Sequence, residues 1–183
     1  LSFEFRASAF GSGLYNPSRT NGANGIQCGI AKAPANVFSI ECIAVALTTT
    51  LTFPLCGFNA NFPLGASYDR VMWINAGTPK FSIFAGSTKT VTSSVTVAAG
   101  QAVHVIGTSD GTDIRIYVNG VPGGSAVGGT AYAGNTYFHC GALRYGDEAT
   151  TTQDAVMLLA NYASVCWSDK EAAARYADPF SYV

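Results

Sequence analysis

The sequence predicts an all-β protein, a two-sheet antiparallel β-sandwich of jelly-roll type with one short C-terminal helix. Three observations carry this prediction. Short strand-like runs recur along the chain, with turn residues roughly every 8 to 12 positions. Residues 101–120 read as two strands with a tight turn, and one helix start signal stands near the C-terminus. The 183 residues are 48% hydrophobic and 11% charged, which suits a single domain over residues 1–183 with a substantial core.

Apolar alternation and turn residues place the expected elements along the chain. The run at residues 37–47 is almost continuously apolar, so we expect it to be a central strand. The other elements are, in order, a strand at 3–6, a loop at 11–25, strands at 71–75 and 81–85 separated by a turn at 77–80, a strand at 90–98, the meander at 101–120, a Gly-rich connection at 122–134, a strand at 136–143, a polar loop at 146–153 and a strand at 154–161.

The meander carries the clearest turn signal in the chain. Apolar residues alternate through both of its strands, and Ser109 to Thr112 connect them. Asn119 and Gly120 follow the second strand, and this pair tolerates the positive φ that both central residues of a type I′ turn require. Residues 101–120 therefore predict antiparallel pairing.

One helix is signalled after Trp167. Ser168 and Glu171 form a capping box, in which each side chain bonds the backbone amide of the other residue. Trp167 is placed to contact Ala172, and Pro179 stops the helix. We expect this helix to plug one end of the sandwich.

Two segments resemble a known family. IRIYVNG at residues 114–120 is similar to the hairpin of laminin-G-like domains in the concanavalin A-like lectin/glucanase superfamily. Residues 154–158, 167–171 and 175–180 resemble that family's last strand, helix and closing segment. The chain departs from the family at Ala155, where an acidic residue is expected, and in lacking a Trp just before His104. The resemblance implies a lectin-like jelly roll whose residues 180–183 pair near residues 1–5.

Charge excludes several partners. Ten basic and 11 acidic residues give a net charge of −1, so no strong field draws the chain to nucleic acid or to an anionic membrane. The longest apolar stretch, residues 155–167, is too short to span a bilayer. A charged fraction of 11% is low for a soluble domain and favours either assembly with a partner or an exposed location outside the cytosol.

The cysteines argue against a metal site and against a fully disulfide-linked domain. The chain has five cysteines, no CxxC pair and two histidines, which makes a zinc site improbable. An odd number leaves at least one thiol unpaired unless it bridges two chains, which favours a protein made in the cytosol. The five are Cys28, Cys42, Cys56, Cys140 and Cys166.

Catalytic signatures are sparse, and we predict that the chain is not an enzyme. Retaining β-glucanases need two carboxylates about 5 Å apart, and no two of Glu4, Glu41, Glu148 and Glu171 alternate on one strand. A Gly-x-Ser-x-Gly motif is absent. His104 and His139 read as strand residues with satisfied ring nitrogens.

Calcium is the one cofactor that the sequence suggests. Asp110 with Asp113, or Asp147 and Glu148 with Asp154, gather oxygen ligands in loops, as calcium requires. Alternatively, Asp110 is simply a turn residue and the other three belong to a solvated loop.

Aromatic side chains on a sheet face could stack on sugar rings, although most such residues serve packing. The ligand-binding candidates are Trp73, Tyr117, Tyr132 and Tyr145, with Tyr68 and Tyr137 as further positions.

Three function classes remain open. The resemblance favours a non-catalytic structural or adhesive module on a virion surface, because phage genomes encode lone laminin-G-like domains whose ending is similar to residues 171–180. Such a capsid decoration, head-fibre or tail protein contacts other virion proteins or copies of itself, and could bind a cell-surface glycan. The alternatives are a secreted or cell-surface carbohydrate-binding module and, less favoured, a glycoside-active enzyme.

Overall fold

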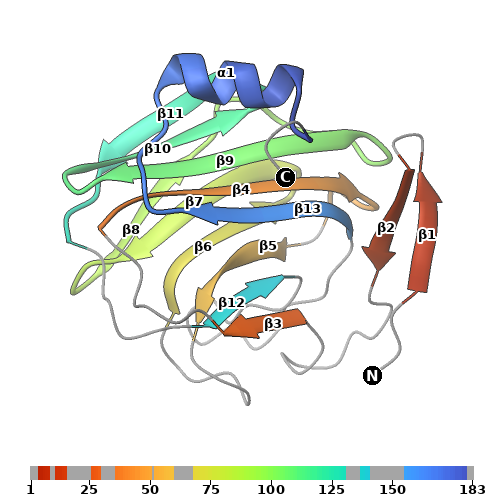
Figure 1. Cartoon of the computed structure of the whole chain (residues 1–183), viewed down its shortest axis with the longest axis horizontal. Coiled ribbons are helices and arrows are strands. Elements are labelled where there is room, and N and C mark those ends of the chain that lie inside the picture. Colours follow the sequence, from red (N-terminus) through yellow and green to blue (C-terminus); the bar gives the residue numbers. More distant parts are fainter. Residues whose placement is uncertain are drawn as a thin grey trace.

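The computed structural model describes residues 4–8, 11–15, 26–29, 36–50, 52–59, 68–130, 137–140 and 155–180. Their strands form two antiparallel sheets, and the expected jelly-roll β-sandwich is confirmed (Figure 1). The seven-stranded sheet has the order β1-β2-β13-β4-β9-β10-β11, and the six-stranded sheet has the order β3-β12-β5-β6-β7-β8. The resulting sandwich supplies two outer faces and two edges on which a site can form.

The seven-stranded sheet consists of β1 (Glu4–Ser8), β2 (Gly11–Tyr15), β4 (Val37–Ala46), β9 (Ala102–Asp110), β10 (Asp113–Val118), β11 (Val121–Val127) and β13 (Ala155–Ala163). The six-stranded sheet consists of β3 (Ile26–Gly29), β5 (Thr52–Asn59), β6 (Tyr68–Asn75), β7 (Thr78–Phe84), β8 (Thr88–Thr92) and β12 (Tyr137–Cys140). A single helix, α1 (Asp169–Ala177), is present in the described part of the chain.

The main core lies between the two sheets and is built by alternate residues of each strand. In β10, Ile114, Ile116 and Val118 belong to this core, so Arg115 and Tyr117 point to the opposite face, because strand side chains alternate. The prediction that residues 37–47 form a central strand is confirmed, since β4 pairs with both β13 and β9.

Two hairpins have tight turns in which both central residues have positive φ. Asn119 and Gly120, which join β10 to β11, have φ values of 53° and 75°, as the Asn-Gly signal predicts. Ala76 and Gly77 join β6 to β7 with φ values of 46° and 75°. The second turn therefore lies at residues 76–77, whereas the sequence placed it at 77–80, because Ala is rarely found at positive φ.

Three further expected boundaries are wrong. The predicted loop at 11–25 contains β2, and the predicted strand at 90–98 ends at Thr92, where β8 stops. The predicted connection at 122–134 begins with β11, whose Pro122 and two glycines read as a loop. An edge strand tolerates proline, because one side of it needs no ladder hydrogen bond, and β11 is such an edge.

The capping box is confirmed, but the expected place of the helix is not. Ser168 is the N-cap, and both bonds of the box are present. Trp167 and Ala172 pack in one cluster with Ile106 and Tyr117, which are outward-facing residues of β9 and β10. The helix therefore covers the outer face of the seven-stranded sheet (Figure 1), and it does not plug an end of the sandwich. No helix in the described ranges is long and apolar enough to cross a membrane.

Candidate functional site

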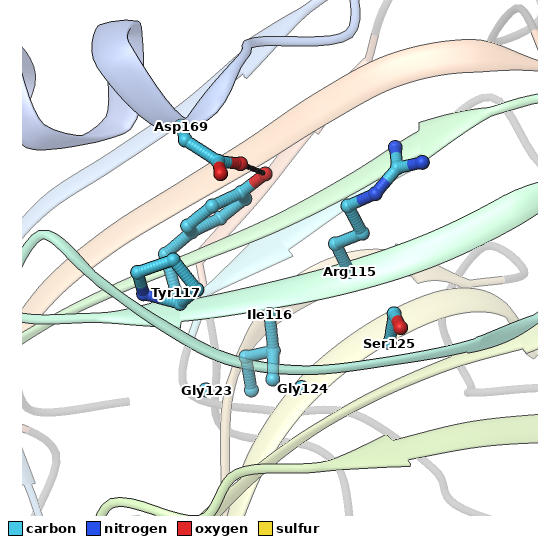
Figure 2. Close-up of a pocket in the computed structure, with 8 residues that line it drawn as sticks. Arg115, Ile116, Tyr117, Gly123, Gly124, Ser125 and Asp169 are labelled. Atoms are coloured by element: carbon cyan, nitrogen blue, oxygen red, sulfur yellow. Dashed lines mark hydrogen bonds between the residues drawn. The ribbon is translucent and has the colours of Figure 1, made fainter.

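A polar pocket lies where the N-terminal end of α1 meets the β10–β11 hairpin (Figure 2). Its volume is about 350 Å³, within the usual size range of ligand pockets. Strand alternation turns Arg115 and Tyr117 toward it, β11 contributes Ser125, and the first helical residue contributes Asp169. The complete lining is Arg115, Ile116, Tyr117, Pro122, Gly123, Gly124, Ser125 and Asp169.

Tyr117 connects the strand to the helix. Its hydroxyl donates to Asp169 Oδ1 at 2.9 Å, and the close-up shows Asp169 reaching down from α1 to meet it (Figure 2). Burial and this carboxylate raise the pKa of Tyr117 to about 12. The phenol is therefore neutral at physiological pH and keeps its proton for Asp169.

Arg115 is held by the carboxylates of Asp110 and Asp113. Its Nη1 lies 2.9 Å from Asp110 Oδ2, and its Nη2 lies 3.7 Å from Asp113 Oδ2. The backbone amides of Asp113 and Thr112 also donate to Asp110 Oδ1, at 2.8 and 2.9 Å. These amides, followed by Arg115, lower the pKa of Asp110, and the hydrogen bond to Asp110 raises the pKa of Arg115. Both groups remain charged.

A buried charged cluster fixes α1 to the sheet. Glu41 of β4 is 0% exposed, and Arg175 of α1 donates to both of its carboxylate oxygens, with Nε 3.0 Å from Oε1. His104 Nε2 lies 2.8 Å from the same Oε1, and Asn161 donates to Oε2 at 3.4 Å. The Arg175 guanidinium also lies 3.9 Å above the Trp167 ring. This cluster anchors the element that carries Asp169.

Of the acidic residues predicted to bind calcium, the structure describes Asp110 and Asp113. Asp110 accepts two turn amides and pairs with Arg115, as the turn-residue alternative expects. Asp147, Glu148 and Asp154 lie outside the described residues. Among the residues that are described, no group of three or more His, Cys, Asp or Glu side chains could hold a metal ion.

The predicted stacking residues are largely covered where the structure describes them. Trp73 is 7% exposed and Tyr117 is 2% exposed. Trp73 Nε1 donates to Ser82 Oγ at 3.2 Å, and Lys80 Nζ lies 4.9 Å from its ring centroid. Both rings pack on outer sheet faces without an open surface for a sugar. Tyr132 and Tyr145 lie outside the described residues, as do the side chains of Tyr68 and Tyr137.

Cys42, Cys56 and Cys166 carry free thiols. Burial raises the pKa of Cys56, as it does that of Cys166. Both of these thiols are therefore protonated near neutral pH, which makes them unreactive.

Sequence reasoning named Tyr117 but missed its partners in the pocket. Arg115 could have been found, because it alternates with core residues and must share an outer face with Tyr117. Asp169 is an acidic residue in the first turn of the helix, which is a common pattern that does not point to a pocket, and Ser125 fell within the expected Gly-rich connection. Their convergence depends on where α1 docks, and no local pattern encodes that.

The sandwich, its covering helix and the pocket between them define a lectin-like jelly-roll protein. The description "Concanavalin A-like lectin/glucanases superfamily" belongs to the family that matches residues 33–157. The chain belongs to this superfamily, as the resemblance implied. Comparison with curated proteins gives no match.

Solved structures share the fold at low sequence identity. A native heptameric SAP-like pentraxin from Limulus polyphemus is 14% identical, with a TM-score of 0.63, over 86% of this chain and 80% of that one. Domain 4 of AbnA, a GH43 extracellular arabinanase from Geobacillus stearothermophilus, in complex with arabinotriose, is 13% identical, with a TM-score of 0.65, over 94% and 80%. The botulinum neurotoxin serotype G binding domain is 11% identical, with a TM-score of 0.69, over 96% and 44%. The chain thus spans less than half of that binding domain.

Proposed function

We propose that the chain is a non-catalytic adhesive module that binds a neutral saccharide in the pocket beside α1. The convergence of a guanidinium, a carboxylate and a hydroxyl in one pocket supports this proposal. Saccharide hydroxyl groups both donate and accept hydrogen bonds, so they need donors and acceptors placed together. Arg115 supplies donors, Asp169 Oδ2 supplies an acceptor, and Ser125 supplies both.

The charge balance of the site favours a neutral sugar or an amino sugar over an acidic one. Arg115 is the cationic side chain lining the pocket, and its charge is already matched by Asp110 and Asp113. Asp169 adds a further carboxylate at the rim. A sialic or uronic acid would bring a negative charge toward this excess of carboxylates, and such like-charge contacts disfavour a ligand.

The structural neighbours support the ligand class without locating the site. The AbnA domain was solved in complex with arabinotriose, and another neighbour is the receptor binding domain of botulinum neurotoxin D. These likenesses show the fold alone, so the saccharide class is our proposal, which the arabinotriose complex of that neighbour and the pocket chemistry of this chain support.

The complete burial of Glu41 also supports a binding role over a catalytic one. Glu41 is fully buried and held by Arg175 and His104. A glycosidase carboxylate has to reach the scissile bond of its substrate, and Glu41 has no such access. The other described glutamate side chain, Glu171, closes the capping box.

We further propose display on a virion surface, in contact with other virion proteins or copies of the chain. The free thiols of Cys42 and Cys56 fit synthesis in a reducing compartment. Val121, Val127 and Val165 are each more than half exposed, which leaves apolar surface for a neighbour. The alternative location is extracellular, as a secreted or cell-surface carbohydrate-binding module.

A glycan array with four proteins tests the saccharide proposal. The unaltered protein is expected to bind neutral or amino saccharides in preference to acidic ones. Asp169→Ala and Ser125→Ala should weaken binding, Asp169→Ala by roughly tenfold or more, because a hydrogen bond to a charged group is lost. Lys170→Ala, the neighbouring exposed helix residue, is the control and should bind normally. Binding confined to acidic glycans, or unchanged in Asp169→Ala, would contradict the proposal.

Light scattering with a count of free thiols tests the proposed location. A stable oligomer with reduced cysteines is expected of a virion component. A monomer that is stabilised by calcium and holds two disulfides would favour the secreted alternative, and repeating the measurement with a chelator also tests the calcium prediction.

A further inference from the structure

Two cysteines lie directly opposite each other on neighbouring strands of the six-stranded sheet. Cys56 of β5 pairs with Cys140 of β12 in the antiparallel register, and both carry thiols in this structure. Directly opposite residues project from the same face of a sheet. That face is the inner one here, because the next pair on this face, Phe58 and Phe138, packs in the core with ring centroids 5.2 Å apart.

The register brings the two sulfur atoms within reach of a covalent bond. Opposite residues of an antiparallel pair have Cα atoms about 4.5 or 5.5 Å apart, and the Cα atoms of a disulfide lie about 4.4–6.8 Å apart. A bond between Cys56 Sγ and Cys140 Sγ therefore needs side-chain rotation and at most a small approach of the strands. The Cys56 thiol donates to the Glu41 carbonyl at 3.8 Å, and a thiol is a weak donor, so this contact hardly resists the rotation.

The two thiols differ in exposure, which gives them different roles. Cys56 is 0% exposed, whereas Cys140 is partly exposed. Burial, followed by a hydrogen bond with Cys42 and the nearby Cys140 thiol, raises the pKa of Cys56. Cys56 is thus protonated and closed to solutes, while a small oxidant can reach Cys140, and the susceptibility of a thiol to oxidation follows its exposure.

We infer that Cys140 and Cys56 form a peroxide-responsive pair, in which oxidation of Cys140 leads to a disulfide between β12 and β5. The Cys140 thiol loses its proton and its sulfur attacks hydrogen peroxide. The O–O bond breaks, Cys140 becomes a sulfenic acid, and the released hydroxide takes the proton to give water. The Cys56 sulfur then attacks Cys140 Sγ, the S–O bond breaks, and the hydroxyl leaves as water with the Cys56 proton. One peroxide thus takes two electrons from two thiols.

The bond would fasten one side of the six-stranded sheet. The strand β12 has four residues and lies between β3 and β5, so it connects β3 to the rest of the sheet. A bond between Cys56 and Cys140 also closes a long loop, which constrains the unfolded chain more than the folded one. The oxidised protein should therefore be more stable. The inference is independent of the saccharide proposal, because neither cysteine lines the polar pocket.

Mass spectrometry of the whole chain after brief treatment with hydrogen peroxide tests the inference. We expect the intact mass to fall by about 2 Da, as one disulfide replaces two thiols. Proteolysis after the remaining thiols are blocked should release one linked pair of peptides, which contain Cys56 and Cys140. Oxidation of Cys140 to a sulfinic acid without a link, no oxidation of Cys140, or a link that joins either cysteine to Cys28, Cys42 or Cys166 would overturn the inference.

Two serine variants and a stability measurement locate the effect. Cys140→Ser should prevent the link and leave the Cys56 thiol intact after peroxide treatment. Cys166→Ser is the control, since Cys166 is also partly exposed, and this variant should still form the link. Peroxide should move the urea midpoint of the unaltered protein and of Cys166→Ser to higher urea, reversibly with dithiothreitol, and should not raise that of Cys140→Ser. A reversible rise in Cys140→Ser would contradict the assignment.

Discussion

Glu41 is the residue on which the position of α1 depends most. Its carboxylate is fully buried and receives hydrogen bonds from Arg175, His104 and Asn161. Arg175 is separated from Glu41 by 134 positions, so the pair joins the C-terminal helix to a central strand. Removal of one partner from a buried ion pair leaves an uncompensated charge, which costs far more than the pair itself contributes.

The substitution Glu41→Gln should destabilise the protein in a pH-dependent way. Burial tends to raise the pKa of Glu41, but hydrogen bonds from His104 and Arg175 outweigh it and hold the pKa below its ordinary value of 4.5. A lowered pKa contributes stability that is present above that value and is lost as the pH falls through the folded-state pKa. We expect a loss of roughly 3–5 kcal/mol at pH 7, shrinking in acid.

Urea denaturation at pH 7 and in acid measures this difference. Asp113→Asn is the control, because Asp113 is 41% exposed in its pair with Arg115 and such surface pairs contribute about 0–1 kcal/mol. A Glu41→Gln variant of normal stability at pH 7, or a deficit that does not change with pH, would show that the cluster does not anchor α1.

At the scale of single residues, the sequence predicts faces better than partners. The alternation in residues 114–118 correctly places Tyr117 on one face and Ile116 on the other. Whether Tyr117 is open to a ligand depends on the helix that covers it, which is 52 positions away. The expectation of satisfied histidine nitrogens is met for His104 at Nε2 but not at Nδ1, and side-chain geometry of this kind has no local signature.

Among the elements, the β10–β11 hairpin lines the polar pocket and packs its turn against α1. Its turn residue Gly120 has a φ of 75°, and a Cβ atom there would lie 2.9 Å from Tyr176 Cβ. Gly120 is thus required both by the turn and by the close approach of the helix. Asn119 also holds the turn, since its Oδ1 accepts the amide of His104 at 2.9 Å.

Two glycine substitutions separate these requirements. Gly86 has a φ of 74° with nothing within 4 Å of its Cβ position, so Gly86→Ala should cost only the left-handed backbone penalty of roughly 1–2 kcal/mol. Gly120→Ala should cost a further 1–3 kcal/mol, approximately, because it also overpacks against Tyr176. Thermal or urea unfolding of both variants makes the comparison. Equal losses would mean that α1 does not press on the hairpin.

Elements whose ends are fixed by nearby residues could be predicted from the sequence. Elements that form only by pairing with another strand could not. The capping box at Ser168 and the Asn119-Gly120 turn satisfy their own backbone groups, so the sequence shows them directly. By contrast, β11 contains Pro122, Gly123 and Gly124 and becomes a strand only because β10 pairs with it. The packing surface for α1 is likewise formed by distant strands.

At the scale of the whole molecule, the two sheets approach each other closely at Gly107. Gly107 of β9 lies opposite Phe81 of β7, and a Cβ atom at residue 107 would be 2.6 Å from Phe81 Cγ. Phe81 is fully buried and also packs edge-on against Phe38, with ring centroids 6.0 Å apart. The Phe81 ring therefore occupies the space that a side chain at residue 107 would fill.

Substitution of this glycine should be partly rescued from the opposite sheet. Gly107→Ala is expected to destabilise by roughly 1–3 kcal/mol, because it overpacks the core. The same change should cost less in a Phe81→Leu background, with a coupling of about 0.5–3 kcal/mol for residues in contact. A double-mutant cycle by urea denaturation gives this coupling. Additive losses would contradict the direct contact.

The family and the fold class were within reach of the sequence, because hairpin spacing and the C-terminal helix are local patterns in the right order. The ligand site was not, since it unites β10, β11 and the start of α1. The expectation of an end-plugging helix was wrong for the same reason. Packing over more than 100 positions of sequence, as between Glu41 and Arg175, is decided by the complete sandwich.

The place where a saccharide binds is the observation that decides most about this protein. Backbone amide NMR of the labelled protein would be followed during titration with galactose, N-acetylglucosamine and arabinotriose. We predict that at least one of these sugars shifts the amides of Arg115, Gly124, Ser125 and Asp169 in a saturable manner. Saturable shifts on another surface, or none with these sugars while an acidic sugar binds, would contradict the proposed saccharide site.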